Sequence, residues 1–189
     1  FVPGAWAADS ATTRSTRRPN IVILLADDLG WTDIHTGATS GGHGSTYYQT
    51  PAIDTLATHG MSFSSMYMCP NCAPARAALM TGQSAVHNGV YNVTSLSRGT
   101  GVLEPPQQSK YIRHDAVTIA ETLKAAGYST CQVGKYHVSM HDDITKYDGF
   151  DFNYGGGKAG DGSPHGYFAV RKRAHWTFIA LGPEMNAFA

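Results

Sequence analysis

The sequence IVILLADDLG, residues 21–30, contains the clearest indication of the fold, because a short apolar run leads directly into two carboxylates. Residues 21–26 are all apolar and several are β-branched, which is typical of a strand buried on both faces of a parallel sheet. The run ends at Asp27 and Asp28, and Gly30 follows shortly after. We therefore expect both carboxylates to lie at the carboxyl end of a buried strand.

Helix and strand patterns alternate along the rest of the chain, which predicts an α/β fold. The predicted helices span residues 51–58, 74–81 and 117–126, and the further predicted strands span residues 61–68, 128–133 and 176–181. Ligands of α/β sheets bind outside the carboxyl ends of the strands. We therefore expect Asp27 and Asp28 to share one edge of the sheet with Lys135 and His137, which follow the strand at 128–133.

Length and charge exclude several classes of protein. A chain of 189 residues suits one domain with its own core. Its 14 basic and 14 acidic side chains balance, so no electrostatic surface for nucleic acid is indicated. No run approaches the roughly 18 consecutive apolar residues that a membrane span requires.

The first residues resemble an exported leader. Ala5-Trp6-Ala7 has the small-x-small pattern of a signal-peptidase site. We interpret residues 1–19 as a signal-peptide remnant and linker, and residues 20–189 as the N-terminal part of a catalytic domain. The expected location is periplasmic or secreted.

The sequence MCPNCAPAR, residues 68–76, admits two interpretations. Cys69 and Cys72 form a CxxC pair, which occurs in redox proteins and zinc sites. A structural zinc site needs a second pair of ligands, and the remaining Cys131 is alone. The helix predicted at 74–81 places Cys72 at a helix N-terminus, which favours a motif that begins at Cys72.

CAPAR at residues 72–76, with the downstream Thr81-Gly82, resembles the sulfatase signature CxPxR followed by TG. The resemblance extends to NIVILLADDLG at 20–30 and to GKYH at 134–137, where sulfatases commonly have GKWH. It implies an alkaline-phosphatase-like α/β sandwich with a mostly parallel central sheet, incomplete in this chain. Two positions depart from the pattern: Ala75 replaces a common serine, and Tyr136 replaces tryptophan.

The resemblance implies that a separate maturation enzyme oxidises Cys72 to formylglycine, which is then hydrated to a diol. One hydroxyl would attack sulfur and expel the alcohol, and the other would then expel sulfate and restore the aldehyde. An unmodified thiol cannot complete the second step. Asp27 and Asp28, with the modified side chain at position 72, would bind Ca²⁺, or alternatively Mg²⁺, since both prefer oxygen ligands.

The other roles follow from the same resemblance. Arg76 would contact the diol and the metal-binding carboxylates, Lys135 would bind a sulfate oxygen, and His137 would orient the diol or help to collapse the intermediate. His87 falls where sulfatases often carry a histidine, and we predict that it contributes to substrate binding. The expected substrate is a sulfated small molecule or carbohydrate.

Two alternatives remain open. A phosphonate or phosphate monoester hydrolase of the same superfamily would use the same groups on a similar tetrahedral anion. An inactive chain that only binds sulfated ligands is the second. Nothing after Gly155 matches the remaining metal ligands, the leaving-group histidine or the second lysine of the family. We therefore expect a fragment with weak metal binding and little activity by itself.

Overall fold

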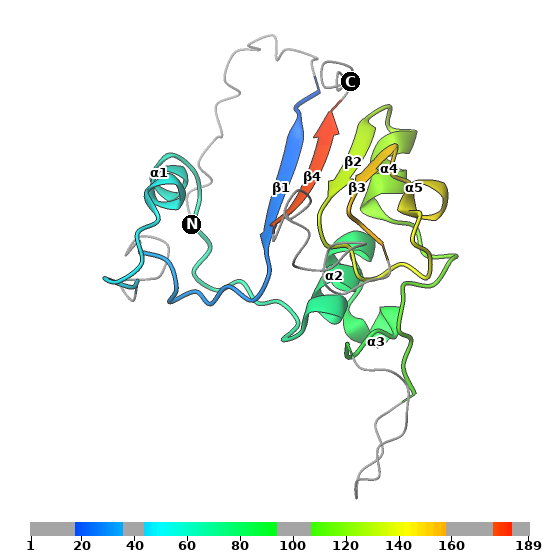
Figure 1. The fold of residues 1–189 in the computed structure, drawn as a ribbon, viewed down its shortest axis with the longest axis horizontal. Coiled ribbons are helices and arrows are strands. Elements are labelled where there is room, and N and C mark those ends of the chain that lie inside the picture. The colour runs from blue at the N-terminus through cyan, green and yellow to red at the C-terminus, as the bar shows by residue number, and fades with distance from the viewer. Residues whose placement is uncertain (1–17, 36–43, 94–106, 158–175, 183–189) are drawn as a thin grey trace, which may run out of the picture.

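The computed structural model describes residues 18–35, 44–93 and 107–157, together with the backbone of residues 176–182. The elements in chain order are β1 (Ile21–Ala26), α1 (Pro51–His59), α2 (Cys72–Thr81), α3 (Ala85–Asn88), α4 (Ile119–Ala125), β2 (Ser129–Val133), α5 (Ile144–Tyr147), β3 (Phe152–Tyr154) and β4 (Trp176–Gly182). Helices and strands are mixed along the chain, as the α/β prediction requires (Figure 1).

The strands form one sheet in the order β1-β4-β2-β3. Strand β4 lies antiparallel to both β1 and β2, whereas β2 lies parallel to β3. Strands β1, β2 and β3 therefore run in one direction, as a mostly parallel sheet requires. The described sheet is nevertheless mixed, because β4 is inserted between β1 and β2 in the opposite direction. Sheets that combine both directions are common in α/β folds.

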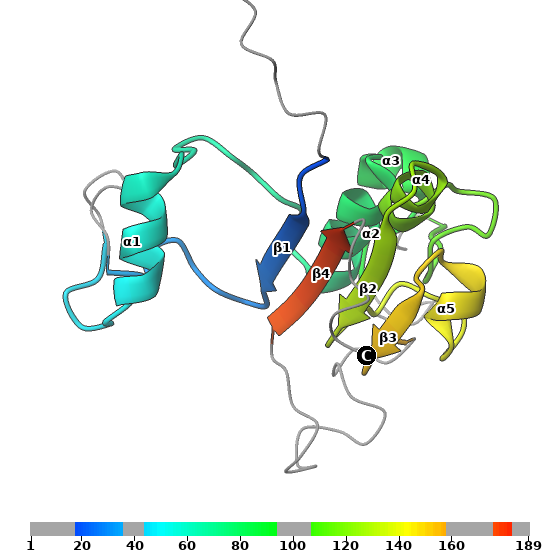
Figure 2. The ribbon, with the colours of Figure 1, turned by 90° about the horizontal axis from the view of Figure 1, so that it is seen from above.

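Helices α2 and α4 lie together on one side of this sheet, and α4 also contacts β2 (Figure 2). Helix α1 stands apart, on the other side of β1 from these helices. None of its residues is buried. The described core therefore forms between the sheet and the layer that contains α2 and α4.

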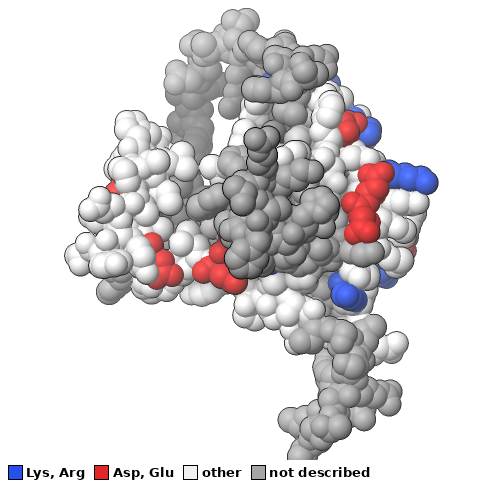
Figure 3. All heavy atoms as spheres, in the orientation of Figure 1, with Lys and Arg blue, Asp and Glu red and all other residues white. Residues whose placement is uncertain are grey.

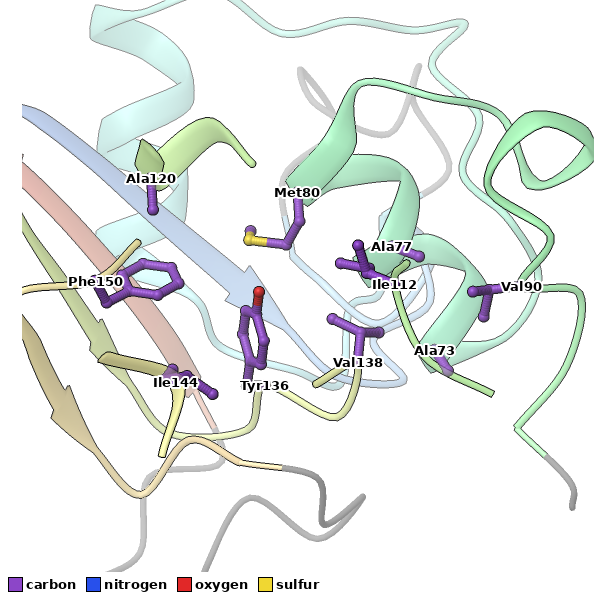
Figure 4. Packing of buried hydrophobic residues seen from close by; sticks show 10 residues of the cluster. All are labelled: Ala73, Ala77, Met80, Val90, Ile112, Ala120, Tyr136, Val138, Ile144 and Phe150. Carbon is purple, nitrogen blue, oxygen red and sulfur yellow. The ribbon is translucent and has the colours of Figure 1, made fainter. Parts of the chain in front are cut away.

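The core is a cluster of small and medium apolar side chains around one aromatic pair (Figure 4). Its buried members are Ala73, Ala77, Met80, Val90, Ile112, Ala120, Tyr136, Val138, Ile144 and Phe150. The rings of Tyr136 and Phe150 meet edge to face with centroids 5.7 Å apart, a favoured geometry for aromatic pairs. Tyr136, one of the two departures from the family pattern, is thus a core residue that stands between Lys135 and His137 in the sequence.

Four sequence-based predictions need correction. The strand at residues 21–26 was expected to be buried on both faces, but Val22 is 61% exposed and Leu24 is 55% exposed. Residues 61–68 form no strand: all of them are exposed, and no strand among the described residues pairs with them. Helix α2 begins at Cys72 rather than at residue 74. Helix α4 begins at Ile119 rather than at residue 117, because Thr118 and Glu121 form a reciprocal capping box at its start.

Two features of the described residues, their surface charge and the length of their helices, bear on binding to nucleic acid or to a membrane. On the face drawn in Figure 3, basic side chains lie beside acidic ones at the right, whereas the described residues at the lower left show acidic side chains. No helix in the described ranges combines the length and apolar character needed to cross a membrane. The leader predicted at residues 1–19 lies almost entirely outside the described residues, so it stays a prediction.

Candidate active site

Asp27 and Asp28 follow β1 directly, as the sequence predicted. Asp28 adopts a left-handed backbone conformation, with φ of 56°. Aspartate is among the few residues other than glycine that enter this region readily, because its short side chain can form local hydrogen bonds. The turn ends the strand and leaves both residues lining the same cavity. Asp27 is partly buried and Asp28 is exposed.

Helix α2 brings Cys72 and Arg76 to this edge. Cys72 is the first helical residue, and the side chain of Asn71 caps the helix by accepting a hydrogen bond from the Cys72 backbone N–H at 3.2 Å. Arg76 lies about one turn further along and is only 4% exposed. Arginine is seldom buried without a partner, so its burial identifies it as part of a charged site.

The segment after β2 supplies the second cation. Lys135 is 8% exposed, and its Nζ donates a hydrogen bond to Asp27 Oδ2 at 2.7 Å. Arg76 Nη2 lies 3.5 Å from the other carboxylate oxygen, Oδ1, and Arg76 Nη1 donates to the backbone carbonyl of Lys135. Asp27 therefore joins three segments that are far apart in the sequence.

These contacts determine the charge of the site. Burial raises the pKa of Asp27, but the hydrogen bond and charge of Lys135, with the charge of Arg76, outweigh it and lower the pKa overall. Burial lowers the pKa of Arg76, and the Asp27 carboxylate opposes that change. The site therefore holds an ionised carboxylate between two cations.

His137 completes the group through an unexpected backbone conformation. Its φ is 72°, and its N–H donates to the carbonyl of Gly157 at 2.9 Å. The backbone therefore turns at residue 137, after β2 has ended at Val133, and this left-handed turn brings the ring near the cations. Burial, followed by the charges of Lys135 and Arg76, lowers the pKa of His137 to about 4. The imidazole is therefore neutral at pH 7, and its buried Nδ1 has no hydrogen-bond partner among the described residues.

A cavity of about 220 Å³ opens between the end of β1 and the start of α2. Its lining residues are Leu25, Ala26, Asp27, Asp28, Leu29, Met68, Cys69, Pro70, Asn71, Cys72, Ala75 and Arg76. The nucleophile candidate and both metal-ligand candidates therefore face one space. Lys135 meets this space through its bond to Asp27.

The donor groups of the cavity fit a hard cation in kind but form only part of a coordination shell. Asp27 and Asp28 offer carboxylate oxygens, the ligands preferred by Ca²⁺ and Mg²⁺. Within the described ranges, no three side chains of His, Cys, Asp or Glu are grouped so that they could hold a metal ion. The three cysteines are all free thiols, so Cys69 and Cys72 form no disulfide.

His87 lies elsewhere. It belongs to the short helix α3, its Nδ1 lies 2.9 Å from Ser84 Oγ, and it lines a separate cavity of about 570 Å³ with Arg113 and Asp115. Helix α2 spans about 15 Å between Cys72 and this second cavity, at 1.5 Å per residue. The predicted substrate-binding role of His87 stays a prediction, and the described geometry does not bring it to the other candidates.

One residue of the site was missed. Asn71 lines the cavity and contacts both the backbone and the thiol of Cys72, with 3.9 Å between Cys72 Sγ and Asn71 Oδ1. The signal was available, since asparagine directly before a helix is a preferred N-cap.

Known proteins are similar to this chain over most of its length. The family model described as Sulfatase matches residues 19–165. The chain belongs to the sulfatase family. A sulfatase of Formosa agariphila is 46% identical over 154 residues, covering 77% of this chain and 28% of that protein. N-acetylgalactosamine-6-sulfatase of Rattus norvegicus is 39% identical over 121 residues, covering 64% of this chain and 22% of its own length.

Steryl-sulfatase of Homo sapiens is 36% identical over 160 residues, which are 79% of this chain and 25% of that enzyme. The chain therefore spans about a quarter of the length of the curated relatives it matches. Family membership implies the alkaline-phosphatase-like α/β fold, of which the described residues of this sulfatase chain form a sheet and one helical layer.

Proposed function

We propose that this chain carries the nucleophile-bearing part of an active site that hydrolyses sulfate esters. The observation that carries the proposal is the ionised Asp27, held by Lys135 and Arg76 beside Cys72. A sulfate ester is anionic, so an attacking nucleophile needs cations that neutralise the sulfate oxygens. The site concentrates two buried cations next to the proposed nucleophile, as this chemistry requires.

Each residue has a proposed task. A formylglycine made from Cys72 by a separate maturation enzyme would supply the nucleophilic hydroxyl. Arg76 orients that group from one turn along α2, and Lys135 binds a sulfate oxygen with its compact charge. His137, neutral at pH 7, accepts or returns a proton at a ring nitrogen.

A divalent metal ion would add positive charge to the proposed site. Ca²⁺, or Mg²⁺ in its place, held by Asp27, Asp28 and the side chain at position 72, would supply the charge that polarises the ester. Lys135 and Arg76 offset the effect of burial and lower the pKa of Asp27, so this carboxylate is ionised and able to act as a ligand at neutral pH. Two carboxylates and one oxygen fall short of the six or more ligands usual for Ca²⁺.

The substrate class follows from the family by analogy only. The names of the relatives cover both a sulfated amino sugar and a steroid sulfate. We propose a sulfated carbohydrate or small molecule for this chain, and a periplasmic or secreted location. A phosphate or phosphonate monoester presents the same tetrahedral anion and is the alternative substrate.

The decisive experiment is mass spectrometry of the peptide that contains Cys72, after expression with and without a formylglycine-generating enzyme. Conversion lowers the mass by about 18 Da, and hydration restores it almost completely. We expect conversion only with the maturation enzyme. An unmodified Cys72 in the native host would refute the nucleophile assignment.

Turnover is tested with aryl sulfate, aryl phosphate and aryl phosphonate, using Cys72→Ala as the control. A preference for the sulfate supports the proposal, and a preference for either phosphorus ester supports the alternative. Binding of sulfated ligand without turnover would identify a chain that recognises its ligand but lacks the full catalytic site.

A further inference from the structure

Asn71 makes more contacts with residue 72 than an ordinary helix cap requires. Its Oδ1 accepts from the Cys72 N–H at 3.2 Å and lies 3.9 Å from Cys72 Sγ, within reach of a thiol donor. Both atoms belong to the residue that the proposed chemistry depends on. Asn71 is also one of the residues that line the 220 Å³ cavity.

The direction of this amide is determined by a chain of hydrogen bonds. The Val93 N–H donates to Asn92 Oδ1 at 2.7 Å, so the oxygen of Asn92 must face that way. Asn71 Nδ2 donates to the same oxygen at 2.9 Å. If the Asn71 amide were flipped, its Oδ1 would face Asn92 Oδ1, and two acceptors would meet without a donor. Its NH₂ group would then face the Cys72 N–H, and two donors would meet.

We propose that Asn71 is a positioning residue for the nucleophile at position 72, and that Asn92 holds the Asn71 amide in the required direction. The inference rests on the proposed function. Asn71 Oδ1 accepts a hydrogen bond from the side chain at position 72, whether that group is a thiol or one hydroxyl of the hydrated aldehyde. The other hydroxyl is left to face the cavity and the substrate.

This role differs from those of the charged residues. Arg76 and Lys135 supply positive charge, whereas a neutral amide oxygen only accepts a hydrogen bond. Asn71 therefore selects one rotamer of residue 72 without changing the charge of the site. Because the backbone N–H of Cys72 and its side chain share one acceptor, Asn71 couples the start of α2 to the orientation of the nucleophile.

The test uses the 189-residue chain produced without a maturation enzyme, so that position 72 is a thiol. Alkylation by iodoacetamide at one pH is followed by mass spectrometry for Cys72 and Cys69. Cys69 lines the same cavity and serves as the internal reference. We expect Asn71→Leu to increase the Cys72 to Cys69 rate ratio about two- to five-fold, the effect of losing one weak hydrogen bond.

Two substitutions of Asn92 form a matched pair. They test whether Asn71 acts by orienting the side chain at position 72 and not only by capping helix α2. Asn92→Asp keeps oxygen acceptors for Asn71 Nδ2 and the Val93 N–H, whereas Asn92→Leu removes them. We expect Asn92→Leu to raise the Cys72 to Cys69 rate ratio as Asn71→Leu does. We expect Asn92→Asp to leave this ratio at the wild-type value. Circular dichroism of all variants checks that α2 is intact. An unchanged ratio in Asn71→Leu, or equal effects of the two Asn92 variants, would overturn the inference.

A second measurement uses chain matured to formylglycine. An aminooxy probe condenses with the aldehyde and releases water, but does not react with the hydrate. Since Asn71 stabilises the hydrate through its hydrogen bond, Asn71→Leu is expected to react about two- to five-fold faster. Failure of the chain to mature would refute the proposed function, whereas a normal maturation with unchanged probe kinetics would refute only the role of Asn71.

Discussion

An Arg–Asp ion pair lies near each end of helix α2, and the two pairs differ in how far they are exposed to water. At the start, Arg76 is 4% exposed and pairs with the partly buried Asp27. Beyond the end, Arg113 and Asp115 form an ion pair in which both side chains are more than 60% exposed, beside an exposed His87. Both ends adjoin a cavity and both contain an Arg–Asp pair. Burial distinguishes them, because charges are strongly coupled only where water is excluded.

The largest expected effect comes from Arg76→Met. The variant leaves Asp27 with Lys135 alone and removes the buried donor to the Lys135 carbonyl, so we expect about 2–4 kcal/mol lower free energy of unfolding. Denaturant titration followed by circular dichroism measures it. Arg113→Met is the matched control at the other end of α2, where the midpoint should not move. Equal effects of the two variants would contradict the comparison.

Lys135→Met tests the second cation. The variant leaves Asp27 with Arg76 alone, so the pKa of Asp27 should rise toward its ordinary value. We expect about 1–3 kcal/mol loss of stability at pH 7. In the wild type this stability is present above the ordinary pKa of Asp27 and is lost as pH falls through the lowered one. Stability curves that coincide for variant and wild type from pH 7 to pH 3 would show that the bond contributes nothing.

His137 should give the site a stability that depends on pH. Its pKa is about 4 in the folded chain and 6.5 in the unfolded chain. Between these values the unfolded state binds the proton and the folded state does not, so stability falls as pH falls from 6.5 toward 4. Between pH 6.5 and pH 4, we expect the loss of stability to be about 1–2 kcal/mol smaller in His137→Asn than in the wild type. This value allows for the partial exposure of the ring. Denaturant titrations at pH 7, 5.5 and 4 measure it, and an unaltered slope would exclude His137 as its source.

The smallest expected effect belongs to His87→Ala. His87 is exposed and lies at the far end of α2 from Cys72. We expect the Cys72 to Cys69 alkylation ratio and the unfolding midpoint to equal those of the wild type. A changed ratio would show that the two ends of α2 communicate, and would support the substrate-binding role predicted from the sequence.

The existence of strand β1 and the extent of helix α1 were predictable because their signals are local. Apolar β-branched residues specify β1, and Pro51 and Gly60 bracket α1. Pro74 lies inside α2, so it did not mark the start of that helix at Cys72. The strand at 61–68 was a wrong prediction, because β-propensity depends on a neighbouring strand that local pattern does not reveal. The reversed direction of β4 was equally inaccessible, since a short apolar run carries no information on direction.

The sequence alone determined the chemistry available: a cysteine at a helix start, two carboxylates after a strand, and a lysine and histidine after another. Spacing along the chain sufficed for this, because strand ends meet at one edge of an α/β sheet. Only the tertiary structure decided which of these groups act together. It buried Arg76 and Lys135 against Asp27, turned His137 inward, moved Tyr136 into the core and left His87 at a separate cavity. Burial and hydrogen-bond direction arise from contacts between distant segments, and they set the charge and orientation on which the chemistry depends.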